Sequence, residues 1–171
     1  MASRVVQLLT IVALLLAATA ASAGVDSRTT AVTVERIIDG DTLVVRGGAR
    51  VRLVQIDAPE SGTECYSGAS RLVLIHLVPP GSRGILEADP ALDRVDRYGR
   101  LLRYVHAGGR NVNVELVRRG AATPWFYGGD RGRYAARLLA ATAAARTAQR
   151  GMWAACRVSW TPDGPVDTRP R

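Results

Sequence analysis

The stretch from Ile37 to Glu60 reads IIDGDTLVVRGGARVRLVQIDAPE and decides the fold class. Apolar and polar residues alternate along most of it, which is the two-residue period of a half-buried β-strand. A Gly-Gly pair separates two of these strands, as in a tight hairpin turn. Charged residues interrupt the pattern at or near strand ends, namely Arg52 and the acids Asp39, Asp41, Asp57 and Glu60. The stretch therefore predicts a hairpin that gathers carboxylates around one place.

Outward from this stretch, the same patterns predict further strands and three helices. Strands are expected over 32–38, 43–46, 50–56, 84–87 and 101–106, and helices over 67–78, 111–119 and 130–155. Five strands with a helix between the third and the fourth fit an α+β, mainly β, five-stranded Greek-key barrel of the OB type. An open α+β sheet is the alternative.

The two ends of the chain differ in composition from its middle. Residues 1–23 carry a basic Arg4, an apolar run and a small-residue Ala-Ser-Ala site, which is typical of a cleaved secretory signal; an uncleaved anchor is the alternative. We expect a secreted protein with no membrane attachment after cleavage. Residues 24–156 are expected to form the domain. Residues 157–171, rich in Pro, Asp and Arg, are expected to be a flexible tail.

The charge of the chain favours an anionic partner. All 23 basic residues are arginine, against 15 acids, and loss of residues 1–23 leaves 22 arginines and a net charge of +7. Without lysine, a Walker-type phosphate loop and a Schiff-base enzyme are both excluded. A basic domain of this kind is typical of proteins that bind nucleic acid or another acidic polymer, although a merely solvated basic surface is also consistent with the charge.

The chain contains two cysteines, Cys65 and Cys156. In an oxidising compartment an even count predicts one disulfide, and two thiolates alone make a poor zinc site. Closing a loop of about 90 residues would stabilise the fold by about 4–5 kcal/mol in the chain-entropy model.

The acids suit a metal site built from a few oxygen ligands better than an EF-hand loop or a histidine-based site. An EF-hand counted from Asp39 would need a glutamate where Arg50 stands. The two histidines, His76 and His106, lie in apolar surroundings and are interpreted as structural. Asp41 begins one strand and Asp57 ends another, so a barrel can bring both together for a hard divalent cation such as calcium. Turn-forming aspartates and a surface ion pair are the alternative for each residue taken singly.

Three motifs in order resemble the staphylococcal nuclease family: IDGDT from Ile38, RLVQIDAPE from Arg52 and DRYGR from Asp96. The resemblance runs from about residue 32 to Cys156 and implies an OB barrel with three helices. It implies calcium ligation by Asp41, Asp57 and the Ala58 carbonyl, where the family often has threonine. It also implies a water-activating role for Glu60.

The resemblance implies substrate contacts as well. The phosphate-binding arginines of the family fall on Arg52 and Arg100, and its nucleotide-contacting loop falls on Arg97 and Tyr98. Two later aromatic positions fall on Trp125 and Tyr127; core packing is the alternative for these two.

Together, these observations predict a monomeric, calcium-dependent nuclease that hydrolyses phosphodiester bonds of DNA and RNA with low sequence specificity. The main alternative is a catalytically inactive OB module that binds single-stranded nucleic acid. A secreted binder of acidic surfaces is a third hypothesis.

Overall fold

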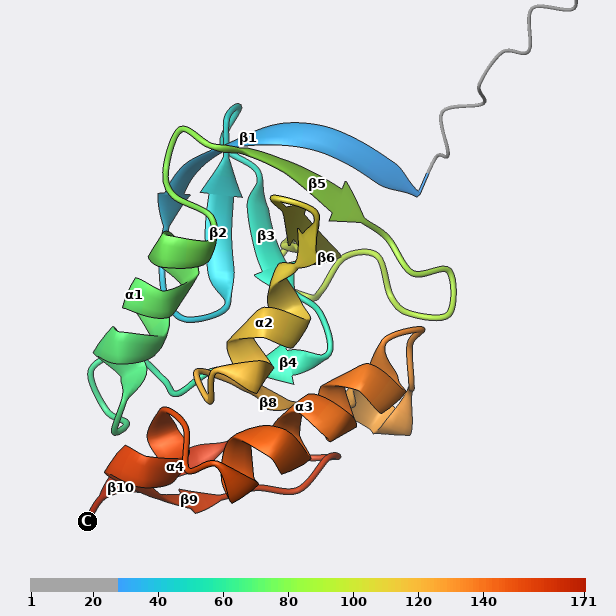
Figure 1. Ribbon diagram of the computed structural model, residues 1–171. Helices are drawn as coiled ribbons and strands as arrows, with labels where there is room; N and C mark the ends of the chain where they lie inside the picture. Colours follow the sequence, from blue (N-terminus) through green and yellow to red (C-terminus); the bar gives the residue numbers. More distant parts are fainter. Residues whose placement is uncertain (1–27) are drawn as a thin grey trace, which may run out of the picture.

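The alternating stretch forms neighbouring strands of a barrel in the computed structural model, which describes residues 28–171 (Figure 1). β1 (Thr29–Ile37), β2 (Thr42–Val45) and β3 (Arg50–Leu53) run antiparallel, with Leu43 opposite Val51. The Gly-Gly turn between β2 and β3 has φ values of 94° and 85°, which glycine adopts without strain. The predicted strand over 50–56 is wrong in one respect. It breaks after β3, and β4 (Ile56–Asp57) pairs elsewhere.

Two further strands close the barrel. β5 (Arg83–Glu87) pairs with β1 and with β6 (Leu101–Ala107), and β6 runs parallel to β3. A short β7 (Arg110–Asn111) follows on the other edge of β6. The mixed five-strand closure confirms the predicted OB-type barrel over the open sheet.

The helices lie beside and below the barrel in Figure 1. α1 (Ser67–Leu77) connects β4 to β5, and α2 (Val112–Arg118) packs between the barrel and α3 (Ala135–Thr147). The long helix predicted over 130–155 is wrong, because α3 ends at Thr147 and α4 (Met152–Ala155) is separate. A close approach explains the break: a Cβ on Gly151 would lie 2.3 Å from the carbonyl oxygen of Gly120.

The C-terminal segment is ordered, so the expectation of a flexible tail over 157–171 is wrong. β9 (Cys156–Ser159) and β10 (Asp167–Pro170) form an antiparallel hairpin. Val166 and Trp153 belong to a small apolar cluster around this hairpin, separate from the barrel core. Cys65 and Cys156 are joined by the predicted disulfide, with Cα atoms 6.1 Å apart.

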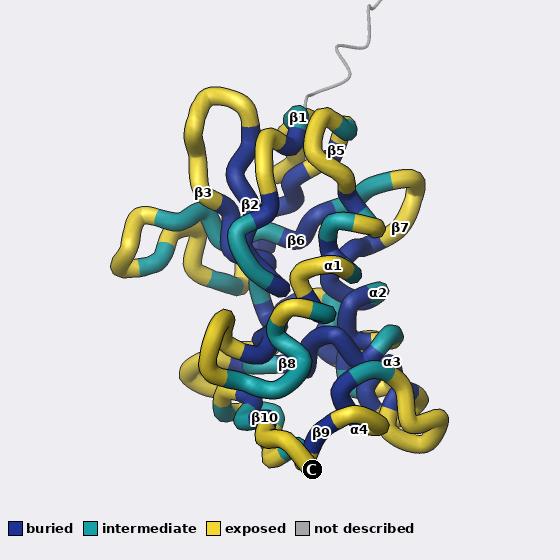
Figure 2. The backbone as a smooth tube through the Cα atoms, turned by 90° about the vertical axis from the view of Figure 1, so that its left-hand side faces the viewer, coloured by how far each residue is buried: buried dark blue, intermediate teal, exposed yellow. Residues whose placement is uncertain are grey.

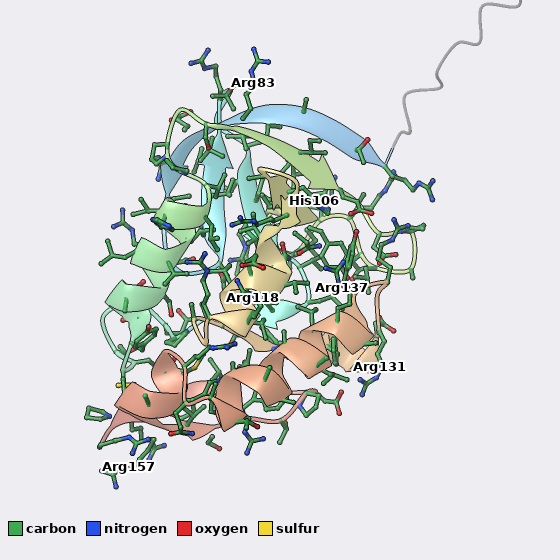
Figure 3. The ribbon with its side chains drawn as sticks, viewed as in Figure 1. Arg83, His106, Arg118, Arg131, Arg137 and Arg157 are labelled. Atoms are coloured by element: carbon green, nitrogen blue, oxygen red, sulfur yellow. A yellow bond between two sulfur atoms is a disulfide. The ribbon has the colours of Figure 1, made fainter. Side chains whose placement is uncertain are left out.

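The main core fills the barrel and the space toward α2 and α3, where Figure 2 shows buried chain. Leu43, Leu53, Val105 and Phe126 are fully or almost fully buried there. Arginines such as Arg83, Arg131 and Arg157 lie at different ends of the molecule in Figure 3, so basic charge surrounds the fold. Between residues 28 and 171, no helix combines the length and apolarity needed to cross a bilayer. The predicted signal over 1–23 lies outside the described residues.

Candidate functional site

Two acids from different strands meet at one arginine. Asp41 precedes β2 and Asp57 ends β4, and both side chains are buried. One nitrogen of Arg52, Nη2, lies 3.0 Å from Asp41 Oδ2 and 2.8 Å from Asp57 Oδ1. The structure therefore brings these two predicted residues together, as the strand-end argument expects.

Arg52 also fastens the turn between β3 and β4. Its Nη1 donates to the carbonyls of Leu53 and Ile56, at 2.9 and 2.7 Å. Both terminal nitrogens of Arg52 are thus engaged by the protein. This arginine fixes the acids in place, in addition to the phosphate contact that the family resemblance implies for it.

The electrostatics of the acids follow from their burial. Burial raises the pKa of Asp41 to about 7, against the opposing charge of Arg52. Burial likewise raises the pKa of Asp57, while Arg52 and the Val166 N–H oppose the rise. Thr42 Oγ1 and the Ala58 N–H donate to Asp41 at 3.0 and 2.9 Å. The raised pKa values show that burial makes the ionised form of these carboxylates costly, so a cation bound beside them would stabilise it.

The donor set fits calcium. Among residues 28–171, no three His, Cys, Asp or Glu side chains gather closely enough to hold a metal ion by themselves. A cation at Asp41 and Asp57 would therefore complete its shell with carbonyl oxygen and water. Calcium accepts such mixed oxygen ligands readily. Ala58, whose carbonyl the family resemblance implies as a ligand, is buried and donates its N–H to Asp41 Oδ2.

Gly40 allows the loop before β2 to approach Ala58. A Cβ at position 40 would lie 2.6 Å from the Cβ of Ala58 and 2.8 Å from that of Ser70. No side chain fits at this position unless the acid-bearing loop moves. The glycine of the IDGDT motif is therefore a packing requirement of the site.

Replacing Gly40 by alanine is expected to lower the free energy of unfolding by about 1–3 kcal/mol, the usual cost of overpacking. Gly68→Ala is a matched control, because a Cβ at this position in α1 meets nothing within 4 Å. That control should be neutral or slightly stabilising. Urea unfolding of both variants measures the difference, and equal stabilities would show that Gly40 is not constrained.

A cavity of about 350 Å³ opens beside Arg52. Arg100 is held in it by Asp96, whose Oδ2 accepts from Arg100 Nε at 2.6 Å. Burial alone would raise the pKa of Asp96, but the backbone and side-chain N–H groups of Arg100 and the Tyr98 N–H lower it overall. The Nη groups of Arg100 remain available for an anion, because the Asp96 bond uses only Nε. Besides Asp96, the predicted residues that line this cavity are Arg52, Arg97, Tyr98, Arg100, Trp125 and Tyr127.

The aromatic residues of the cavity are exposed enough to contact a ligand. Tyr98 and Tyr127 are 63% and 72% exposed, which argues against core packing for these rings. Trp125 and Tyr127 form an edge-to-face pair with ring centroids 5.7 Å apart. Arg97 lies over the Tyr98 ring and also donates to its hydroxyl. These side chains provide faces on which a base or sugar can stack.

Glu60 is exposed on the loop after Pro59. Its carbonyl accepts from the Glu64 N–H, and its own N–H donates to Glu64 Oε2 at 2.6 Å. Burial is the main cause of the raised pKa of Asp57, and Arg52 and the Val166 N–H oppose it. The charge of Glu60 raises this pKa slightly further. Glu60 thus interacts electrostatically with Asp57 and is open to water. His76 and His106 lie elsewhere, and His106 Nε2 is 2.6 Å from Glu87 Oε2.

The sequence did not predict two sets of contacts around the site, those of Gln55 and that of Val166. Gln55 has a left-handed φ of 64°, and its side chain bonds to Asp130 and Gly132, while its carbonyl accepts from the Trp125 N–H. The Val166 N–H donates to Asp57 Oδ2 at 2.9 Å. A glutamine inside an alternating run gives no signal of either feature. The Val166 contact spans 109 positions and comes from a segment expected to be loose.

A sequence model described as "Staphylococcal nuclease homologue" matches residues 50–155. This chain belongs to the staphylococcal nuclease family. The matched range contains most of the site residues named above. Asp41 lies before it, and the whole C-terminal hairpin lies after it.

Curated relatives support the same family. The chain is 40% identical over 108 residues to "Micrococcal nuclease" of Shigella flexneri and 36% identical over 103 residues to "Thermonuclease" of Staphylococcus intermedius. These alignments cover 56% and 55% of this chain, and 59% of each relative. It is also 31% identical over 136 residues to "Endonuclease YhcR" of Bacillus subtilis (strain 168), covering 70% of this chain and 11% of that protein. The matched part of the chain thus spans less than two thirds of the length of each of these three relatives.

Proposed function

We propose that this protein is a calcium-dependent nuclease that hydrolyses phosphodiester bonds of DNA and RNA with low sequence specificity. One observation carries the proposal: Arg52 joins the buried acid pair to a cavity lined by Arg100 and exposed aromatic rings. Carboxylates, phosphate-binding guanidinium groups and stacking faces are the components that phosphodiester hydrolysis requires. The names of the relatives favour the same class of activity.

Each residue has a role in this proposal. Asp41, Asp57 and the Ala58 carbonyl would hold calcium, which would supply positive charge to stabilise the reacting phosphate. Arg100 donates its Nη groups to the phosphate and stabilises the charge that develops on it, and Arg52 adds fixed positive charge. Glu60 accepts the proton of a water molecule as the water oxygen bonds to phosphorus and the bond to the leaving sugar oxygen breaks.

Substrate selection follows from the same lining. Tyr98, Trp125 and Tyr127 offer faces rather than base-edge hydrogen bonds, and Arg97 adds charge, so nucleotides of any sequence can bind. A secreted monomer that acts on nucleic acid outside the cell is consistent with the disulfide, since disulfides persist in oxidising compartments.

Digestion of labelled single-stranded DNA, duplex DNA and RNA tests the proposal. We expect cleavage of all three with calcium, loss of cleavage in EDTA, and recovery when calcium is restored. Fragments from cleavage at many positions would agree with low sequence specificity. Binding of single strands without cleavage in any condition would instead identify a catalytically inactive binding module.

A further inference from the structure

The C-terminal hairpin reaches one of the proposed calcium ligands. Val166, just before β10, is 4% exposed, and its backbone N–H donates to Asp57 Oδ2. This hairpin begins at Cys156, directly after residue 155, where the match to the family model ends. The contact therefore comes from outside the matched part of the chain.

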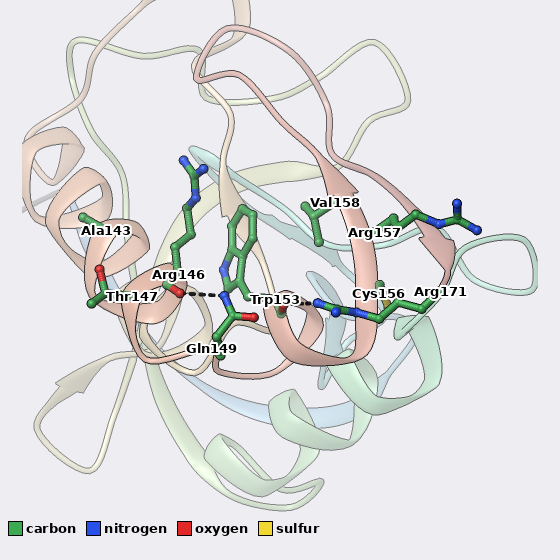
Figure 4. A pocket seen from close by; sticks show the side chains of 9 residues that line it. All are labelled: Ala143, Arg146, Thr147, Gln149, Trp153, Cys156, Arg157, Val158 and Arg171. Carbon is green, nitrogen blue, oxygen red and sulfur yellow. Dashed lines mark hydrogen bonds between the residues drawn. The ribbon is translucent and has the colours of Figure 1, made fainter.

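Several independent contacts hold the hairpin in place. The disulfide fixes its start at Cys156, and Thr168 exchanges two hydrogen bonds with the backbone of Cys65, at 3.2 and 2.7 Å. Arg171 Nη2 donates to the Trp153 carbonyl at 2.9 Å, as the dashed line in Figure 4 shows. The Trp160 indole donates to the Pro124 carbonyl at 2.7 Å. A segment fastened at both ends can hold Val166 at a fixed position.

The two oxygens of Asp57 have different partners. Oδ1 accepts from Arg52 and faces the common point with Asp41, whereas Oδ2 accepts from Val166. β4 has only two residues, so little regular structure restrains Asp57 locally. With Oδ2 bonded to the Val166 N–H, Oδ1 lies against the Arg52 Nη2 that Asp57 shares with Asp41.

We propose that Val166 is a positioning residue, whose main-chain N–H orients Asp57 for calcium binding. This inference rests on the proposed function, because it takes Asp57 to be a calcium ligand. Groups that orient metal ligands in this way typically change metal affinity by about 10–100-fold when removed. The hairpin, including its disulfide anchor, thus becomes part of the calcium site.

A change of one backbone group tests the proposal within the full chain. Cys156 allows a synthetic peptide of residues 156–171 to be ligated to the preceding chain at Ala155. In one product the hydroxy-acid analogue of valine stands at position 166, so that an ester oxygen replaces the N–H and the side chain is unchanged. A second product carries the same change at Gly164, whose N–H donates to the Thr161 carbonyl in the hairpin loop. The all-amide product is the reference.

Titration calorimetry with calcium, and binding of a short single-stranded DNA in EDTA, are measured on all three products. We expect the ester at 166 to weaken calcium binding by roughly tenfold or more, with DNA affinity within about twofold of the reference. The ester at 164 should change neither. Calcium affinities equal for both esters and the reference would overturn the positioning role alone. A reference protein that bound no calcium would overturn both the role and the proposed calcium dependence.

Val166→Pro and Val166→Ala provide a recombinant version of the same comparison. The alanine variant loses more buried side chain but keeps the N–H, whereas proline lacks it. Weaker calcium binding in the proline variant alone, at similar thermal stability, supports the role. Equal calcium binding in the two variants contradicts it.

Discussion

Glu60→Gln is expected to lower the rate of DNA cleavage by about 10²–10⁴-fold at saturating calcium, the usual contribution of a general base. Glutamine keeps the size of the side chain but cannot accept the proton of the attacking water. Glu60 is exposed, so water can reach it. DNA affinity in EDTA should change little, because Arg100 and the aromatic residues line the cavity independently of Glu60.

Glu64→Gln is the matched control for this prediction. Glu64 lies four positions along the same loop and accepts the Glu60 N–H, a bond that glutamine can still accept. The control removes one negative charge from the same neighbourhood while leaving Glu60 intact, so its rate should stay within about threefold of the parent. Rates of single turnover for the two variants decide the assignment. A Glu60→Gln protein that cleaved like the parent would remove Glu60 from the mechanism.

The sequence predicts the barrel well because its signals are local. Alternation between Ile37 and Arg52, with a Gly-Gly turn, specifies a hairpin whatever the rest of the chain does. The meeting of Asp41 and Asp57 also follows, since their strand ends converge once the barrel closes.

The parts that were predicted wrongly depend on contacts distant in sequence. The alternating pattern continues through Gln55, where the backbone turns so that Asp57 pairs with Thr123 of β8 (Thr123–Pro124). The last helix breaks because Gly151 packs against the Gly120 backbone, a contact that no helical pattern reveals. The C-terminal hairpin has the composition of a loop, and contacts distant in sequence, such as those with Cys65 and Asp57, hold it in place.

The role of Arg52 shows what a motif leaves open. The family resemblance assigns it to phosphate, and the structure adds that both its terminal nitrogens bind protein oxygens. Arg100 differs, since Asp96 engages its Nε and leaves its Nη groups toward the cavity. The two arginines therefore differ in the number of terminal nitrogens that are left to bind a phosphate.

Asp41→Asn is expected to raise the free energy of unfolding of the calcium-free protein by about 1–3 kcal/mol at pH 8. The folded-state pKa of Asp41 is raised to about 7 from 3.8, so the folded protein holds this proton more tightly than the unfolded chain. The parent therefore loses stability as pH rises from about 4 to 7, and above pH 7 it bears the full cost of the buried charge. A shift of one pKa unit corresponds to about 1.4 kcal/mol. In the variant Arg52 loses its ion pair with Asp41, which offsets part of the gain in stability.

Calcium should reverse this order of stability. At a calcium concentration of about 100 times its Kd, binding to the folded parent adds about 2.7 kcal/mol, whereas the variant has lost a charged ligand. Asp39→Asn is a graded comparison, because an asparagine oxygen can still accept the Asp41 N–H. It removes a charge that contributes to the raised pKa of Asp41, so it should show a smaller gain than Asp41→Asn. Urea unfolding at pH 5 and pH 8, with EDTA or calcium, gives all the comparisons. Without calcium, the gain of the variant over the parent should be larger at pH 8 than at pH 5, because the parent loses stability throughout this range. With calcium, the gain should disappear. Asp41→Asn could instead be less stable than the parent at pH 8 in EDTA. That result would show that the ionised Asp41 does not destabilise the calcium-free folded protein.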